Sequence, residues 1–193
     1  MTSPERCPAR HARRSKRTLV MIAAAVIAPV ALSYSIYFFA PRGAFTNYGE
    51  LLPTKPIAPI TGVEDSGKMF RLAERPGRWV VLIPSTRTGQ KANETMLFAT
   101  RQARTMQGRE RERIERLWLV ADEAHADAKL VAEHPDVVVV RTSAEQIRTL
   151  PKGAEAIYLI DPLGNLVLAW PRDPDIKALS RDLSRLLKAS RIG

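Results

Sequence analysis

The segment Ala156-Ile-Tyr-Leu-Ile-Asp-Pro-Leu-Gly-Asn-Leu-Val-Leu-Ala-Trp170 decides the fold of this 193-residue chain. Two apolar runs, residues 156–160 and 166–170, flank the turn sequence Asp-Pro-Leu-Gly-Asn. Pro and Gly favour a tight turn, and apolar runs of this length are typical of buried strands. The segment therefore predicts a β-hairpin near the C-terminal end of the chain.

Apolar runs alternate with amphipathic stretches on the N-terminal side of this hairpin. Buried strands are predicted at residues 79–83, 117–120 and 137–140, and helices at residues 94–109, 122–133 and 143–150. After the hairpin, Asp173 is expected to cap a terminal helix with Pro174 at its first position. This order of elements predicts an α/β fold, a mixed sheet with helices on both faces.

The positive charge of the chain is concentrated at one end. The net charge is +10, and residues 1–17 contribute +5 of it, from six basic residues and Glu5. Residues 19–40 then contain no charged residue, and a helix of that length reaches about 33 Å, enough for a bilayer core. The basic side is expected to stay in the cytoplasm, which removes the main support for a nucleic-acid partner.

These features predict four regions in a single-pass protein of a bacterial inner membrane. They are a basic cytoplasmic tail (1–17), a transmembrane helix (18–40), a proline-rich extended strap (41–62) and a periplasmic domain (63–193). A cleaved signal peptide is the alternative for the N-terminal region. The apolar run is longer than that of most signal peptides, and Phe39-Ala40-Pro41 offers no small-x-small cleavage site, so the uncleaved anchor is favoured.

The chain resembles the Sco/SenC branch of thioredoxin-like proteins. The resemblance is carried by Gly77-Arg-Trp-Val-Val-Leu82 and by Tyr158-Leu-Ile-Asp-Pro-Leu-Gly-Asn165, in which Tyr158, Asp161, Pro162 and Gly164 form the fold motif. It implies a thioredoxin-like fold preceded by a transmembrane helix. It also implies a place among membrane-anchored proteins that deliver copper or reducing equivalents during cytochrome c oxidase assembly, and a likeness to small transmembrane proteins associated with that assembly.

At the positions that this family uses for copper or thiol chemistry, the sequence lacks the required residue types. The resemblance implies two cysteines after the first core strand, at Thr88 or Gly89 and at Ala92 or Asn93, and a histidine near Gly153. None of these positions holds a cysteine or histidine, the soft and imidazole ligands that suit copper. The single cysteine, Cys7, precedes the predicted anchor, so no cofactor and no catalytic residue are expected.

Other residues with possible metal chemistry favour structural roles. His125 and His134 are nine residues apart, which places them on opposite sides of a helix, so both are expected to be solvated. Met69, Met96 and Met106 are expected to fill the core. A metal-binding or thiol-independent periplasmic enzyme built on the two histidines remains an alternative function.

Basic side chains supply the expected partner contacts. The arginine-rich run 109–116 alternates in sign, which predicts a solvated helix end, and Arg109, Arg111 and Arg113 form a cationic patch for an acidic partner or anionic lipid. Arg87 and Lys91 flank the loop where the family has cysteines. We expect a non-catalytic accessory protein that binds or positions a partner during respiratory oxidase assembly. An envelope binding module unrelated to oxidases is a further alternative.

Overall fold

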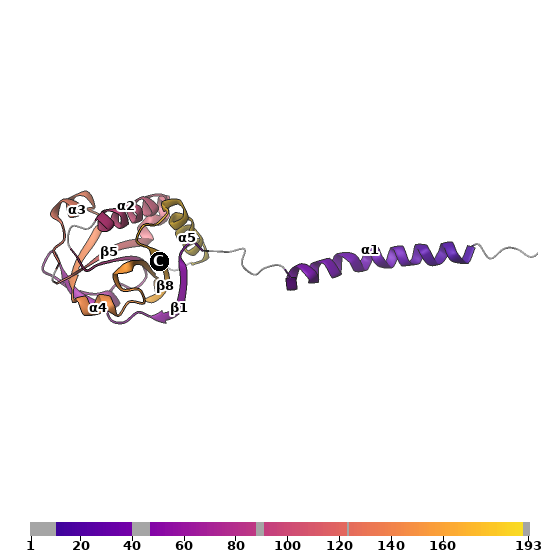
Figure 1. Ribbon diagram of the computed structural model, residues 1–193, viewed down its shortest axis with the longest axis horizontal. Coiled ribbons are helices and arrows are strands. Elements are labelled where there is room, and N and C mark those ends of the chain that lie inside the picture. The colour runs from indigo at the N-terminus through magenta and orange to yellow at the C-terminus, as the bar shows by residue number, and fades with distance from the viewer. Residues whose placement is uncertain (1–10, 40–46, 88–90, 123, 191–193) are drawn as a thin grey trace, which may run out of the picture. The chain divides into compact units, whose positions relative to one another are not determined.

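The structure is a computed structural model that describes residues 11–39, 47–87, 91–122 and 124–190 (Figure 1). The chain divides into two units, residues 1–46 and 47–193. The first contains helix α1 (His11–Phe39), which includes Pro29 and exposes apolar side chains from Leu19 onward. Among the side chains that the structure describes, no helical stretch is long and apolar enough to cross a membrane.

The second unit is built on one eight-stranded mixed sheet with the order β1-β8-β7-β4-β5-β6-β2-β3. The central strands β4, β5 and β6 are parallel, and all other neighbouring pairs are antiparallel. The strands are β1 (Glu50–Pro56), β2 (Thr61–Glu64), β3 (Met69–Arg71), β4 (Trp79–Ser85), β5 (Ile114–Ala121), β6 (Val137–Thr142), β7 (Ala156–Ile160) and β8 (Asn165–Pro171).

The core follows from the apolar runs of the sequence. Every residue of β4 and β7 is buried, as expected for strands covered on both faces. The predicted hairpin is confirmed, because β7 and β8 pair antiparallel with Tyr158 opposite Ala169. The mixed sheet with helices on both faces is also confirmed.

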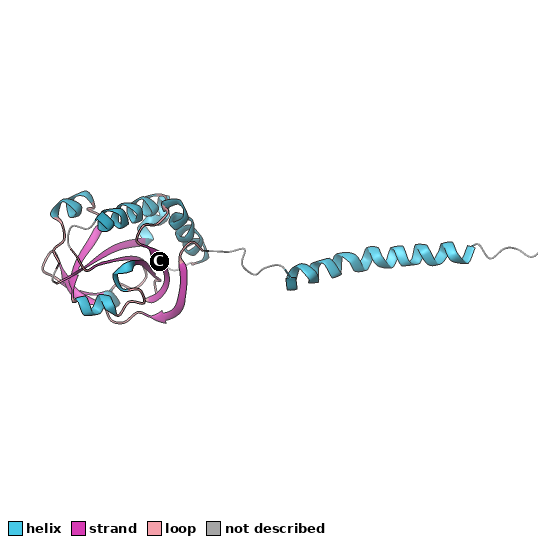
Figure 2. Cartoon of the chain, in the orientation of Figure 1, coloured by secondary structure: helices cyan, strands magenta, loops and turns pink. Residues whose placement is uncertain are grey.

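Helices α2 and α5 lie on one side of the sheet and α4 lies on the other (Figures 1 and 2). Three short 3-10 helices complete the unit. The helices are α2 (Lys91–Thr105), α3 (Ala128–Glu133), α4 (Ala144–Arg148) and α5 (Ile176–Ala189), with η1 (Leu72–Glu74), η2 (Gly108–Arg113) and η3 (Gly153–Glu155).

Helix α5 begins two residues later than predicted. Asp175, rather than Asp173, is its N-cap and accepts a hydrogen bond from Ala178 N at 2.8 Å. Buried Leu179, Leu183 and Leu187 form the apolar face predicted from their spacing. The helix predicted at 122–133 is also shorter, because α3 covers only its second half and is capped by Asp127.

Part of the predicted strap belongs to the sheet. Glu50–Pro56 forms β1, which pairs with β8, and β2 begins at Thr61. Gly49 lies so close to β8 that a Cβ atom there would come within 2.4 Å of Leu168 Cδ2 and 2.6 Å of Trp170 Nε1, so a larger residue would have to displace these side chains. The compact unit therefore begins at Asn47 rather than at residue 63.

Candidate functional site

The carboxyl end of β4 is where the family resemblance places its first ligand loop. Ser85 ends the strand and is buried, and its Oγ donates to the carbonyl of Arg87 at 3.0 Å. The Asn93 side chain donates to the same carbonyl from Nδ2 at 3.1 Å. Two donors from β4 and α2 thus hold the backbone at Arg87. Thr88 and Gly89, where a first cysteine would be expected, lie outside the described residues.

The second cysteine position lies in the first turn of α2. Asn93 is buried there, with 1% of its surface exposed, whereas Ala92 is half-buried. The Oδ1 atom of Asn93 has no hydrogen-bond partner in the described part of the chain. A neutral amide does not supply the soft sulfur that selects Cu(I). The side chain instead packs the start of α2 against the end of β4.

The expected histidine position is occupied by η3, which lies against β4. Tyr158 holds η3 in place: its hydroxyl donates to Gly153 O at 3.0 Å and accepts from Lys152 N at 2.8 Å. Gly153 has φ +53°, a conformation that side-chain-bearing residues rarely adopt. Burial raises the pKa of Tyr158 to about 12, although the Lys152 N–H acts in the opposite direction. Tyr158 is thus a structural residue of this edge.

The rest of the fold motif lies at the opposite edge of the sheet. Asp161 Oδ1 accepts hydrogen bonds from Leu163 N at 2.9 Å and from Asn165 N at 2.8 Å. Pro162 O accepts from Gly77 N, and Gly164, with φ +84°, closes the turn by donating to Asp161 O. The motif therefore builds the hairpin and places no reactive group near Ser85.

The arginine-rich run differs most from its prediction. It is η2 followed by the start of β5, and its last residue, Arg116, is completely buried in the sheet. Arg109 and Arg111 are exposed on η2, as expected for contact residues. Arg113 is mostly buried and donates to Leu187 O and Ser190 O, so it joins η2 to the end of α5.

Arg116 is the centre of a buried polar network that sequence reasoning missed. Its Nη1 donates to Asp136 Oδ1 at 2.9 Å, its Nη2 donates to Leu97 O at 2.6 Å, and its Nε donates to Thr100 Oγ1 at 3.2 Å. Arg104 Nη1 reaches the second oxygen of Asp136 at 3.3 Å. The network joins α2, β5 and the turn before β6. A sequence signal existed, because Arg116 immediately precedes the run 117–120 and continues its strand.

Burial and neighbouring charges shift the pKa values of Arg116 and Asp136. Burial lowers the pKa of Arg116, and Asp136 opposes this effect. Partial burial acts to raise the pKa of Asp136, but the positive charges of Arg116 and Arg104 outweigh it, so the pKa lies below its ordinary value. Both groups are charged at neutral pH. They form an ion pair that stabilises the fold without a substrate-facing reactive atom.

A family comparison adds to this geometry. The family model described as transmembrane-like, thioredoxin-like, C-terminal domain matches residues 79–190. The chain belongs to this family. No curated protein matches it significantly in sequence.

Several solved Sco structures resemble this transmembrane-like, thioredoxin-like protein. Arabidopsis thaliana ScoI with copper bound has 15% identity and a TM-score of 0.58, and the match covers 70% of this chain and 100% of that one. Apo Sco1 from Thermus thermophilus has 20% identity and a TM-score of 0.57, with coverages of 76% and 99%. Yeast Sco1 has 16% identity and a TM-score of 0.58, with coverages of 70% and 96%. The TM-scores show a common fold, and at identities this low the likeness concerns the fold alone.

The histidines of this thioredoxin-like protein do not meet at a metal site. His125 is exposed as expected, but the prediction for His134 was wrong, because it is buried beside Arg116 and Asp136. Burial lowers the pKa of His134, and the charges of Arg116 and Arg101 lower it further. Within the described residues, no three His, Cys, Asp or Glu side chains are grouped so that they could hold a metal ion.

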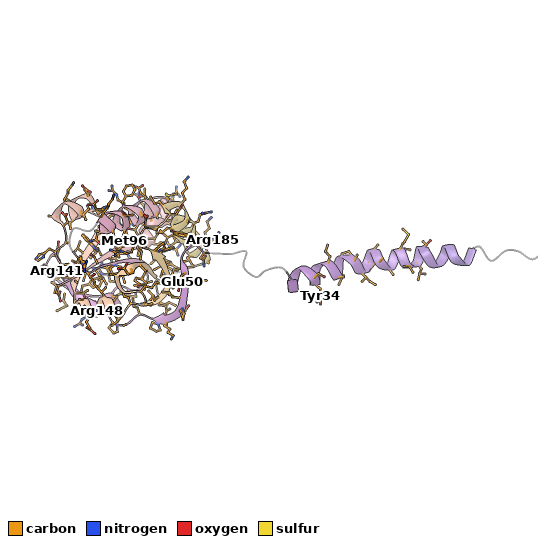
Figure 3. The ribbon with its side chains drawn as sticks, viewed as in Figure 1. Tyr34, Glu50, Met96, Arg141, Arg148 and Arg185 are labelled. Atoms are coloured by element: carbon orange, nitrogen blue, oxygen red, sulfur yellow. The ribbon has the colours of Figure 1, made fainter. Side chains whose placement is uncertain are left out.

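The methionine prediction was correct at one position of three. Met96, which belongs to α2 and is labelled in Figure 3, is fully buried, whereas Met69 and Met106 are exposed. Met69 is on the short edge strand β3, and Met106 follows the last turn of α2. Neither side chain packs in the core.

The predicted contact residues form two groups rather than one. Arg87 and Lys91 are exposed at the amino-terminal end of α2, beside Ser85. Arg109 and Arg111 follow its carboxyl-terminal end. A 15-residue helix is about 22 Å long, so a single small partner surface does not cover both groups.

Proposed function

We propose that this chain is a non-catalytic accessory protein, anchored in the bacterial inner membrane, that binds or positions a protein partner during assembly of a respiratory cytochrome oxidase. The observation that carries the proposal is the edge of the sheet at Ser85. The domain has the Sco-like fold, but Ala92 and Asn93 are the residues where the resemblance implies a second cysteine, and Gly153 lies near the implied histidine position. Without these ligands, the domain is suited to binding rather than to copper or thiol transfer.

The polar side chains at this edge bond to the protein's own backbone, although Asn93 Oδ1 has no partner among the described residues. Ser85 and Asn93 both donate to Arg87 O, and Tyr158 is bonded to two backbone groups at the start of η3. A nucleophile or metal ligand has to present a free, activated atom to its substrate. The donors here stabilise a fixed surface, which suits recognition of a partner.

The anchor is proposed from the sequence. Residues 19–40 carry no charge and follow a tail of +5, and residues 19–39 belong to a helix of 29 residues, about 43 Å long. Positive charge on the tail favours a cytoplasmic N-terminus and a periplasmic domain. The family description, transmembrane-like, supports association with a membrane.

The exposed pair Arg87 and Lys91 is the proposed partner contact. Both are exposed residues near the carboxyl end of β4, where the family resemblance implies the metal ligands. Reversing both charges (R87E and K91E) tests this contact, because like charge at an interface opposes association with an acidic partner. A control is R148E on α4, which reverses one exposed charge on the other side of the sheet (Figure 3).

The decisive experiment is deletion of the gene followed by quantitation of assembled oxidase from its haem spectrum and its activity. We expect a loss of assembled oxidase that is restored by the wild-type chain and by R148E but not by the R87E/K91E variant. Unchanged oxidase after deletion would overturn the assembly role. Full rescue by R87E/K91E would overturn the contact and leave the assembly role in place.

The non-catalytic part of the proposal is tested separately, by Cu(I) competition titration of the full chain in detergent. We expect the chain to bind Cu(I) too weakly to compete with a chelator of micromolar affinity. Cys7 is replaced by serine in this experiment, so that its thiol does not bind the metal. Stoichiometric tight binding by the C7S chain would contradict a non-catalytic role.

A further inference from the structure

The outer face of α5 is uniformly basic. Its exposed residues, apart from Ala189, are Lys177, Arg181, Arg185 and Lys188. At about 100° per residue these four side chains fall within an arc of about 80°, so they form one stripe along the helix. The only acidic residue of the helix, Asp182, is buried. Figure 3 shows Arg185 at the surface of the folded unit.

The 3-10 helix η2 extends this basic surface. Arg113 donates to Leu187 O at 3.1 Å and to Ser190 O at 2.9 Å, which holds η2 against the carboxyl-terminal end of α5. Arg109 and Arg111 are exposed on η2. Of the two acids of η2, Glu110 is paired with Arg113 at 2.6 Å and Glu112 is exposed. We name the four α5 side chains the α5 basic face, with the η2 arginines at its end.

The chain enters the domain directly on α5. The backbone N–H groups of Tyr48 and Gly49 donate to Asp182 at 3.2 Å and 2.8 Å. Asp175, the N-cap of α5, donates from its backbone to the Tyr48 hydroxyl at 2.9 Å. The first described residues of the domain are thus fastened to the helix that carries the basic face.

The connection to the proposed anchor is short. Only residues 40–46 separate α1 from Asn47, and seven residues span at most about 25 Å when fully extended. In an anchored chain, Tyr48 and the part of α5 bonded to it are therefore confined near the bilayer surface. Electrostatic attraction to lipid acts within a Debye length, about 8 Å at physiological salt, so this confinement favours contact.

From the charge and the tether together, we propose that the α5 basic face docks on the anionic phospholipid surface of the membrane that holds α1. The inference rests on the proposed membrane anchorage. Lys and Arg side chains near an anionic lipid surface each favour binding, on the order of fivefold per charge. Docking would give the tethered domain a fixed orientation, with α4 on the side of the sheet away from the lipid.

The test uses the full chain with C7S, reconstituted into nanodiscs. A fluorophore is attached at A189C, at the end of α5, or at E145C, on α4, and the lipid carries a nitroxide on its headgroup. Discs contain phosphatidylcholine alone or with about 30 mol% phosphatidylglycerol. We expect the label at A189C to be quenched only in discs with phosphatidylglycerol and to recover in about 0.5 M NaCl. The label at E145C should stay unquenched.

A matched pair of charge variants isolates the face. The variant K177Q/R181Q/R185Q/K188Q should lower the ratio of docked to undocked domain at least about a hundredfold. The control K68Q/R71Q/R141Q/R148Q removes the same charge from exposed positions elsewhere and should leave quenching unchanged. Circular dichroism of both variants establishes that they fold.

The outcomes separate docking from anchorage. Release of the whole chain by alkaline carbonate would reject the anchor and, with it, this docking. Retention of the chain without quenching at A189C would reject the docking alone. Equal quenching in neutral discs, or quenching that the α5 variant retains, would also overturn the proposal, because neither depends on the charge of the face.

Discussion

Arg116 donates to Asp136 across 2.9 Å, and the arginine of this pair has no exposed surface whereas its partner reaches solvent. The pair joins the middle of the sheet to the turn before β6. Because the desolvation of the guanidinium is compensated mainly by one carboxylate, the stability of the domain depends on that carboxylate.

Replacement of Asp136 should destabilise the domain more than replacement of Arg116. D136N leaves a buried cation without its counter-ion, at a cost of about 3 kcal/mol in the free energy of unfolding. R116M removes the charge and fills a similar volume, at a cost of about 1 kcal/mol. Urea denaturation of both variants and of R116M/D136N measures the coupling. The control is E133Q, whose carboxylate is largely exposed; a D136N chain as stable as E133Q would refute the account.

His134 should make the stability of the domain fall in mild acid. Its folded pKa lies below its ordinary value, so the unfolded chain binds more protons as the pH falls through and below about 6.5. The stabilising contribution of neutral His134 is therefore fully present above the pKa that His134 has in the unfolded chain. It is lost as the pH falls from there toward the lower pKa of the folded chain. H134N should flatten this part of the stability profile, whereas H125Q, at an exposed position, should not. Parallel profiles for wild type and H134N would contradict the burial effect.

Asp182 should hold β1 on the sheet. It accepts from Tyr48 N, from Gly49 N and from Trp170 Nε1, the last at 3.0 Å. D182A leaves these donors without their acceptor and should cost about 3 kcal/mol. Hydrogen exchange should accelerate first in Glu50–Pro56, whereas the exposed-site control D173A should change stability by no more than about 0.5 kcal/mol. Unchanged exchange in β1 would show that its pairing with β8 suffices.

Tyr158 should make the domain labile in strong alkali. Its folded pKa is about 12, above the ordinary 10, so its contribution is complete below pH 10 and is lost as the pH rises toward 12. Y158F should remove this loss and, at neutral pH, should cost about 1–3 kcal/mol because Lys152 N loses its acceptor. Absorbance titration near 295 nm, compared between the two chains, identifies the late ionisation. Ionisation of Tyr158 near pH 10 would contradict its burial.

The fold was largely predictable because its signal is local. The apolar runs 79–83 and 156–160 can only be buried strands, and the turn Asp161-Pro-Leu-Gly-Asn165 satisfies its own backbone through the Asp161 carboxylate. The missing cysteines and histidine were also visible in the sequence. These properties depend on neighbours within a few positions of each other.

The errors concern contacts between distant segments. Arg116 ends a charged run that favours exposure, but the packing of α2 over β5 buries it. His134 also has polar sequence neighbours, yet it is buried at the end of α3. Residues 50–56 have the proline content of a linker, yet β8 offers them an edge to pair with. Local propensity does not contain the position of a partner strand or helix.

The sequence by itself determined the order of elements, the basic tail and uncharged run of the N-terminal region, and the absence of cysteine and histidine where the Sco/SenC resemblance implies them, because each depends on residue type and spacing. Only the tertiary structure decided which charges are buried and which form a surface. It joined Tyr48 to Asp182 over more than a hundred residues, paired Arg116 with Asp136, and left one face of α5 entirely basic. The physical reason is that burial and charge pairing depend on distances in space, which chain separation does not specify.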